Sequence, residues 1–272
     1  MKKIVAVLIM LFVFVLNAIG QTYEWTLKEE YHEENIEAWD INPLEEIIYS
    51  KGRTLYKLNN NFELVFTQSE QGFGVISIID ARHSLNSLVF SENQQVIGIV
   101  DNTLSFQEGK IDLADLSVDY ATHVCYSDQS KRFWVYDEQN SRLLRFEGVK
   151  TSKQQIEISN LTAITQNSIP SSIKESQNQL LLFYKGDGVF VFDLYGSLIR
   201  KFEDVQAKQI STTEKYIYFL RPKQLIRVNR VTGDSIEVDL PSSAILDFKF
   251  FGNTVYFKDK KGIKKYSLIR KQ

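Results

Sequence analysis

The chain of 272 residues contains one cysteine, four prolines and three histidines. Because Cys125 stands alone, no internal disulfide can form, and stability has to come from the burial of apolar surface. Hydrophobic residues make up 43% of the chain, which suffices for a core at this length. In the stretch THVCYSD, Cys125 lies between apolar neighbours on an expected strand, so we expect a buried, unreactive thiol.

An excess of charge of one sign is also missing. Lysine and arginine total 32, aspartate and glutamate total 34, and the net charge is −2. Nucleic-acid binding needs a concentrated basic surface, so nucleic acid is not an expected partner. Alternation along a strand would place a C-terminal group of lysines on an exposed sheet edge, where lysine hinders unwanted strand pairing. These residues are Lys258, Lys260, Lys261, Lys264 and Lys265.

Motifs for metal binding and nucleophilic catalysis are absent from the sequence. His32 opens the stretch HEENI, but Ile36 stands where a second zinc-binding histidine is needed. His123 and Cys125 share a strand face, yet no further cysteine exists to complete a metal site. There is no G-x-S-x-G elbow or Walker loop, and GDGVFV fits a turn between two strands. We therefore expect no metal and no cofactor, and we name no catalytic residue.

The first 20 residues have the pattern of a secretory signal peptide. Lys2 and Lys3 precede an apolar run from Ile4 to Leu16, and the small residues Ala18 and Gly20 precede a cleavage site before Gln21. The run is shorter than the ~20 residues that span a bilayer. We expect residues 1–20 to be removed and the mature chain to have no membrane span. Its expected location is the periplasm or the outer membrane, where it would associate through a partner.

A hairpin-like stretch recurs along the rest of the chain. RFWVYDEQNSRLLRFE combines a β-type run, a polar turn and a second β-type run, and six such copies occur. The first apolar residues after the six turns are 42, 46, 46, 36 and 38 residues apart, which fits a four-stranded propeller blade of ~40–50 residues. The copies are Glu45–Asn59, Asn86–Asn102, Arg132–Glu147, Asn178–Asp193, Glu214–Asn229 and Gly252–Ser267.

Each hairpin is preceded by a candidate inner strand, but only five are followed by a candidate outer strand. The sixth hairpin runs into the C-terminus, while Tyr23–Tyr31 near the N-terminus belongs to no blade. We therefore predict an all-β, six-bladed β-propeller in one domain, residues 21–272, whose last blade is completed by Tyr23–Tyr31. The five outer strands are expected at Phe62–Gln68, Thr103–Gln107, Gln154–Ser159, Ser197–Glu203 and Asp234–Leu240.

These repeats resemble the six-bladed β-propellers of NHL and TolB type, and exported propeller-like proteins of unassigned function in Gram-negative bacteria. The resemblance rests on RFWVYDEQNSRLLRFE and GVFVFDLYGSLIRKFE and covers residues 22–272. It implies an architecture and says little about activity, because propellers include binding modules, scaffolds and unrelated enzymes.

Resemblance to calcium-dependent, lactonase-like propellers would imply acids and amides that point into the channel as metal ligands. The candidates near inner strands do not fall at matching positions from blade to blade, so turn acids and solvated strand ends explain them. They are Asn35, Glu37, Asp40, Asp80, Asp119, Asp128, Glu175 and Asp247.

One short pattern resembles a modification site. Asp234, Ser235 and Ile236 match the Asp-Ser/Thr-apolar sequence that resembles an O-glycosylation acceptor of certain exported bacterial proteins, and a turn before an outer strand would expose Ser235. The alternative is an ordinary turn that uses Gly, Asp and Ser for local backbone bonding.

Three functions remain open at this stage. The leading hypothesis is a non-catalytic, extracytoplasmic scaffold that binds a protein partner in a bacterial envelope assembly. The alternative is a propeller-type hydrolase or lactonase-like enzyme that acts on a small molecule or glycan and gathers several acids at a channel mouth. A ligand-binding sensor is the second alternative, and it requires a pocket of ~300 Å³ or more with polar anchors.

Overall fold

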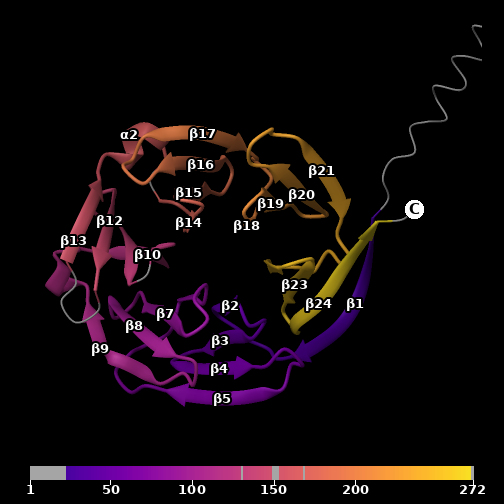
Figure 1. The fold of residues 1–272 in the computed structure, drawn as a ribbon, viewed down its shortest axis with the longest axis horizontal. Helices are drawn as coiled ribbons and strands as arrows, with labels where there is room; N and C mark the ends of the chain where they lie inside the picture. The colour runs from indigo at the N-terminus through magenta and orange to yellow at the C-terminus, as the bar shows by residue number, and fades with distance from the viewer. Residues whose placement is uncertain (1–22, 130, 149–152, 168, 271–272) are drawn as a thin grey trace, which may run out of the picture.

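The computed structural model of the chain describes residues 23–129, 131–148, 153–167 and 169–270. Within these ranges, six antiparallel four-stranded sheets stand around a central axis like blades (Figure 1). The described part is therefore a six-bladed β-propeller, as the repeat predicts. The predicted signal peptide, residues 1–20, lies outside the described residues.

The four strands of each blade are named here in order from the central channel to the rim of the ring. Blades 1 to 3 are β2 (Trp39–Ile41), β3 (Ile47–Lys51), β4 (Thr54–Leu58) and β5 (Leu64–Ser69); β6 (Ile78–Asp80), β7 (Asn86–Ser91), β8 (Val96–Asp101) and β9 (Phe106–Asp112); and β10 (Ala121–Tyr126), β11 (Arg132–Asp137), β12 (Arg142–Glu147) and β13 (Lys153–Ile158). Blades 4 to 6 are β14 (Ser172–Ser176), β15 (Gln179–Tyr184), β16 (Gly188–Asp193) and β17 (Leu198–Glu203); β18 (Gln209–Thr212), β19 (Tyr216–Leu220), β20 (Gln224–Asn229) and β21 (Ser235–Asp239); and β22 (Asp247–Phe251), β23 (Thr254–Asp259), β24 (Gly262–Arg270) and β1 (Tyr23–His32). A 3₁₀ turn at Ala114–Leu116 and the short helix α2 (Leu161–Thr165) lie between blades.

The hydrophobic core is divided among the interfaces between neighbouring blades. The two middle strands of a blade are buried on both faces, as in β7 and β8, so they read as continuous apolar runs. Trp134 and Tyr136 of blade 3, for example, pack with Leu180 and Phe192 of blade 4. Each blade thus buries its faces against its two neighbours, and the outer strands form the rim of the ring.

The N-terminal strand completes the last blade, as predicted. β1 pairs antiparallel with β24 from Tyr23 opposite Arg270 to His32 opposite Gly262. Trp25 lies 5.2 Å from Phe257 between ring centroids, and its indole N–H donates to the Asp239 carbonyl of blade 5 at 2.6 Å. Figure 1 shows the first and last described strands, β1 and β24, side by side in this blade.

A pair of glycines shows that β1 takes the place of an ordinary outer strand. Gly188 opens the third strand of blade 4 with φ +129°, and a Cβ there would lie 2.1 Å from the Phe202 carbonyl oxygen of β17. Gly262 opens the third strand of blade 6 with φ +145°, and a Cβ there would lie 1.9 Å from the Tyr31 oxygen of β1. Both positions need glycine because the outer strand passes so closely.

Two expectations about strands were wrong. The outer strand of blade 2 is β9 rather than Thr103–Gln107, because Asp101 Oδ1 accepts the N–H groups of Thr103 at 2.8 Å and Ser105 at 3.0 Å and folds this stretch into a turn. The C-terminal lysines do not lie on an exposed edge, because β1 covers β24. Instead, Lys264 pairs with Glu30 of β1 at 3.1 Å.

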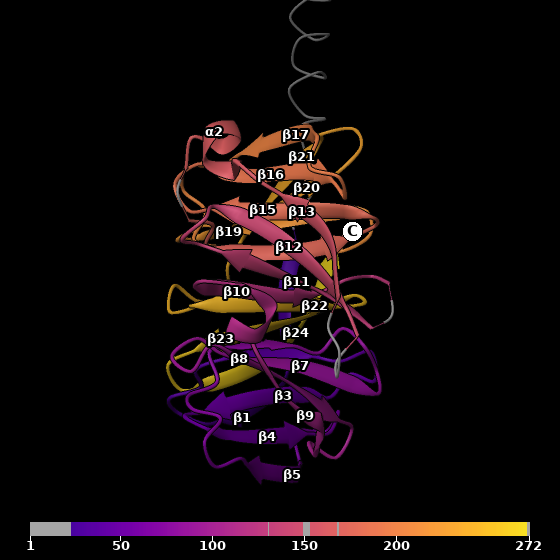
Figure 2. The same ribbon diagram turned by 90° about the vertical axis from the view of Figure 1, so that its left-hand side faces the viewer.

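α2 and β17 lie at one edge of the ring, and β5 lies at the opposite edge (Figure 1 and Figure 2). In the part of the chain that the structure describes, no helix is long and apolar enough to cross a membrane.

Candidate functional site

The six inner strands surround a cavity of about 630 Å³ along the central channel. Its wall combines apolar side chains, such as Ile78, Val124 and Phe250, with hydroxyl groups and charged side chains. The cavity exceeds the ~300 Å³ that a small-molecule site requires, so the size condition of the sensor hypothesis is met.

Four of the sequence-predicted acids fasten one blade to the next. Asp40 Oδ2 accepts the Ala81 N–H of blade 2 at 2.9 Å, and Asp80 Oδ2 accepts the Tyr126 N–H of blade 3 at 3.0 Å. Glu175 Oε1 of blade 4 accepts the N–H of Asp128 at 3.0 Å, and Asp247 Oδ2 accepts the indole N–H of Trp39 at 2.7 Å. The interpretation of these four as turn acids and solvated strand ends was therefore wrong.

The other candidate acids have local roles. Glu37 Oε2 accepts the Gly52 N–H at 2.9 Å, and Asp119 Oδ2 accepts the Asn140 amide at 2.7 Å. Asn35 lies in the loop before blade 1 with φ 61°. These residues do not converge with the channel acids on a common point. Among the described residues, no group of three or more His, Cys, Asp or Glu side chains could hold a metal ion.

Arg82 ties three blades together at one end of the channel, which we call the C-terminal mouth because the inner strands finish there. Its Nη2 lies 2.8 Å from Asp80 Oδ2, and its Nη1 donates to the Glu175 carbonyl at 2.6 Å. Asp128 Oδ1 approaches Nη1 at 3.4 Å. Burial alone would lower the pKa of Arg82 and raise that of Asp80, but their pairing raises the first and lowers the second.

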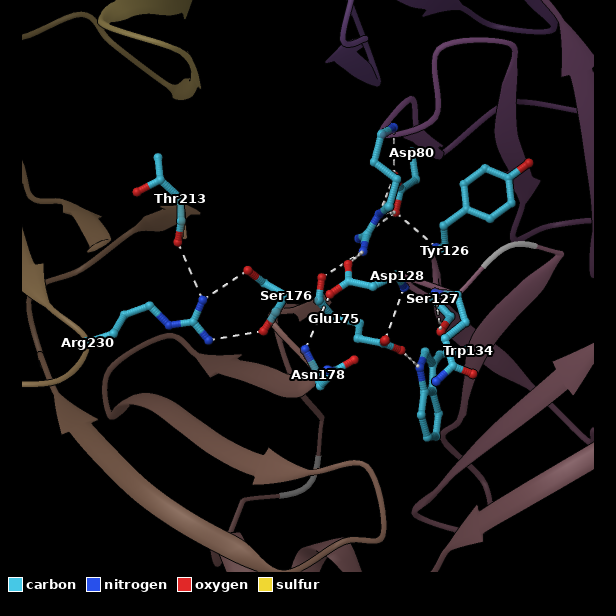
Figure 3. A network of polar contacts seen from close by, with 12 residues as sticks. Asp80, Tyr126, Ser127, Asp128, Trp134, Glu175, Ser176, Asn178, Thr213 and Arg230 are labelled. Atoms are coloured by element: carbon cyan, nitrogen blue, oxygen red, sulfur yellow. Dashed lines mark hydrogen bonds and ion pairs between the residues drawn. The ribbon is translucent and has the colours of Figure 1, made fainter. Parts of the chain in front are cut away.

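This polar network continues around the C-terminal mouth (Figure 3). Glu175 also accepts the indole N–H of the buried Trp134. Arg230 of blade 5 donates to the Ser176 carbonyl of blade 4 at 3.1 Å and to Gln179 Oε1 at 2.7 Å. These bonds link blades 2, 3, 4 and 5 at the C-terminal mouth.

Two lysines of the cavity wall differ in their partners. Lys249 of β22 lies 3.5 Å from Asp40 Oδ1, and although burial would lower its pKa, the nearby acids raise it. The side chain of Lys174, on β14, makes no ion pair or hydrogen bond with the described residues. Burial lowers the pKa of Lys174, and the neighbouring positive charges of Arg82 and Lys249 add to this effect. Among the described residues, Lys174 is therefore a cation of the cavity wall with no carboxylate at ion-pair distance.

The structure places the remaining histidine and cysteine candidates apart from any metal-binding geometry in the described ranges. His123 lines the cavity, shares a hydrogen bond of 3.1 Å with Thr122 Oγ1, and has its pKa lowered by burial. Cys125 is buried, which confirms the predicted burial, and this burial raises the pKa of its thiol to about 12, as expected for an unreactive residue. His83 packs on the Tyr126 ring at 4.6 Å, and the exposed His32 lies 3.8 Å from Glu30.

Sequence reasoning missed the cations of the channel. Lys174, Lys249 and Arg82 lie in or directly after predicted inner strands, but only acids were collected there as candidates. The detectable signal was a lysine within each of the predicted inner strands SSIKES and ILDFKF, whose side chains meet the channel.

The rim carries a second notable surface. β5 is the outer strand of blade 1, and its first three residues are apolar and exposed: Leu64 53%, Val65 42% and Phe66 39%. Among the six outer strands that the structure describes, β5 lacks a charged residue, whereas the other five each carry at least two.

Ser235, the predicted acceptor for O-glycosylation, is the first residue of the outer strand β21 and is exposed. Asp234 before it accepts the Thr232 hydroxyl at 2.7 Å and so takes part in the turn. Modification of Ser235 stays a prediction.

Comparison by sequence identifies no close relative: no family model matches the chain, and no curated protein is significantly similar to it.

Comparison by structure identifies several propellers. A catalytically inactive variant of virginiamycin B lyase from Staphylococcus aureus, solved with quinupristin, superposes with a TM-score of 0.64 and 12% identity, covering 90% of this chain and 100% of that chain. A streptogramin B lyase gives a TM-score of 0.62 and 12% identity over 91% of this chain and 98% of that chain. The WD40 domain of Neurospora crassa Pan2 gives a TM-score of 0.61 and 10% identity over 89% and 94%. At these identities the likeness shows the propeller fold alone.

Proposed function

We propose that the protein is a non-catalytic, extracytoplasmic scaffold that binds a protein partner in a bacterial envelope assembly. The observation that carries this proposal is the uncharged, apolar rim strand β5. Outer strands present unpaired backbone N–H and C=O groups, and proteins commonly protect such edges with charged side chains or bulges. Of these two protections, β5 has only the bulge near Val65, so no charged side chain of β5 opposes the addition of another strand.

The occupant we propose is an extended segment of the partner that adds to blade 1 beside β5. Backbone hydrogen bonds would give such a complex its affinity, and apolar contacts with Leu64 and Phe66 would give it specificity. Burying these exposed side chains is favourable at ~25 cal/mol per Å² of apolar surface.

The proposed location rests on the predicted signal peptide at residues 1–20. Export places the mature protein in the periplasm or at the outer membrane, and the partner would hold it at the envelope. The apolar run of the signal supports this proposal, and localisation by cell fractionation tests it.

The enzymatic alternative has less support in the described residues. The acids near the channel, Asp40, Asp80 and Glu175, already accept backbone N–H groups of neighbouring blades. Two structurally similar proteins are lyases, but the identity of 12% carries no residue role to this chain. The sensor alternative is favoured by the cavity and is developed below.

A matched pair of variants tests the scaffold proposal. Val65→Lys places a charge at the bulge of β5, and Ile199→Lys places one at the equivalent bulge of β17, on the opposite edge of the ring. Val65 is 42% exposed and Ile199 52% exposed, so neither change should unfold the protein.

The measurement is affinity capture of the tagged full-length chain from detergent-solubilised membranes. We expect a stoichiometric partner with wild type and with Ile199→Lys, and its loss with Val65→Lys. Absence of any stoichiometric partner with wild type would refute the scaffold, and equal capture by both variants would refute the assignment to β5.

A further inference from the structure

We propose that the central cavity binds a small organic anion whose charged oxygens contact Lys174 and whose body packs on the apolar wall. This site is independent of the rim strand β5 and would give the protein a ligand-responsive function beyond scaffolding.

The first argument is the pairing of charges in the cavity. Four charged side chains lie close enough to influence Lys174: the cations Arg82 and Lys249 and the acids Asp40 and Asp80. Arg82 pairs with Asp80 at 2.8 Å, and Lys249 with Asp40 at 3.5 Å. One-to-one pairing of these four leaves Lys174 without an ion-pair partner among the described residues. Glu92 and Glu138 also line the cavity, but neither forms an ion pair with Lys174.

The second argument is that the two acids are already occupied. Asp40 Oδ2 accepts the Ala81 N–H at 2.9 Å, and Asp80 Oδ2 accepts the Tyr126 N–H at 3.0 Å. A rotation of either carboxylate toward Lys174 would leave a backbone donor between two blades unsatisfied, which is costly. The ammonium group of Lys174 is therefore available to a ligand.

The third argument is a hydroxyl group that also lacks a partner. Thr212 of β18 lines the same cavity, and its Oγ1 is buried without a hydrogen-bond partner in the described part of the chain. Buried polar groups in native proteins are nearly always paired. A rotation about χ1 would allow this hydroxyl to donate to a ligand oxygen, as an anion requires.

The apolar part of the cavity wall indicates the chemistry of the uncharged part of the ligand. Ile41, Ile78, Ile173 and Phe250 contribute apolar surface, and the volume of about 630 Å³ lies within the range of drug-sized sites. A bare inorganic ion would leave this apolar surface unused. The chemistry that fits is a carboxylate or phosphate monoester on an apolar body.

Calorimetric titration of the mature protein with four named probes tests the proposal. The probes are phenylacetate, phenyl phosphate, inorganic phosphate and the neutral phenylacetamide. We expect at least one of the two aromatic anions to bind with a Kd of about 5 mM or tighter. This value corresponds to about ten non-hydrogen atoms, each contributing the ~0.3 kcal/mol of binding free energy that is usual for drug-sized ligands. Phenylacetamide and inorganic phosphate should bind at least about tenfold more weakly, because phenylacetamide lacks the negative charge and inorganic phosphate lacks the apolar body.

Variants of the two lysines assign the binding to this cavity. Lys174→Met should weaken the aromatic anion about tenfold or more, as the loss of one charge-assisted hydrogen bond predicts, and Lys249→Met should also weaken it. Lys223→Met, at an exposed lysine in the β19–β20 turn, is the matched control and should bind as wild type.

Three results would overturn the proposal: no binding of either aromatic anion at 20-fold the expected Kd of ~5 mM, equal affinity for phenylacetate and phenylacetamide, or unchanged affinity in Lys174→Met. If inorganic phosphate bound as tightly as phenyl phosphate, the inference that the ligand is an organic anion would be wrong. Capture of a partner through β5 does not involve Lys174, so failure here leaves the scaffold proposal intact.

Discussion

The pairing of Asp80 with Arg82 is expected to be a principal stabiliser of the ring, and the Asp80→Ala variant tests this. Asp80 is 7% exposed and accepts hydrogen bonds from the Arg82 guanidinium and from the Tyr126 N–H. Removing one partner of a buried pair costs about 3–5 kcal/mol, and an orphaned buried N–H costs about 1–3 kcal/mol. Because Arg82 keeps the Glu175 carbonyl as a partner, we expect the low end of both ranges, a total loss of about 4 kcal/mol.

The assay is urea unfolding at pH 7, followed by tryptophan fluorescence and checked by circular dichroism. Asp80→Ala, Arg82→Ala and the double variant form a thermodynamic cycle, whose coupling free energy should be about 2 kcal/mol. Asp115→Ala, at an exposed residue of the 3₁₀ turn, is the control and should change the stability by less than about 0.5 kcal/mol. A coupling free energy below about 0.5 kcal/mol would refute the reasoning.

The same pair gives a pH dependence with a defined sign. The folded pKa of Asp80 lies below the ordinary value of 3.8. Its contribution to stability is therefore complete above pH ~4 and is lost as the pH falls through the folded value. The difference in unfolding free energy between wild type and Asp80→Asn should be constant from pH 7 to about pH 4 and shrink below it. A difference that shrinks above pH ~5 would contradict this assignment.

Two further predictions concern the closing strand and the channel lysine. Trp25→Ala removes the ring contacts with Phe257 and Tyr266 and the hydrogen bond to the Asp239 carbonyl. The free energy of unfolding in urea should therefore fall by about 2–3 kcal/mol, against about 1 kcal/mol for Trp25→Phe. Equal stability of wild type and Trp25→Ala would argue against closure by β1. Lys174→Met should raise the melting temperature at pH 7, because a folded pKa below 10.5 means that the charged lysine destabilises the fold. The control Lys223→Met should leave the melting temperature unchanged. A lower melting temperature in Lys174→Met would show that Lys174 has a structural role.

The architecture was predictable because it depends on local sequence patterns that repeat along the chain. Each hairpin combines apolar β-type runs with a turn, and the spacing of the copies fixes the blade size. Closure by Tyr23–Tyr31 followed from one unfilled outer position and one unassigned strand. Gly262 illustrates why such a prediction holds, because only glycine allows the outer strand to pass so closely.

The partners of individual side chains were not predictable. Asp80 and Tyr126 are 46 residues apart, and their bond exists only because blades 2 and 3 pack side by side. The same holds for Lys174, whose surroundings come from four other inner-strand or mouth residues. The error at β9 has a local cause: the side chain of Asp101 folds Thr103–Ser105 into a turn, which competes with their strand pattern.

Hydrogen exchange of β5 is the most direct measurement of the proposed strand addition. In the free protein, the outward-facing amides of β5 have no partner strand among the described residues and should exchange quickly. After partner binding, we predict slowed exchange in Leu64–Ser69 and unchanged exchange in the outer strand β17. A complex in which β5 exchanges as fast as in the free protein would contradict the central claim that this rim strand binds the partner.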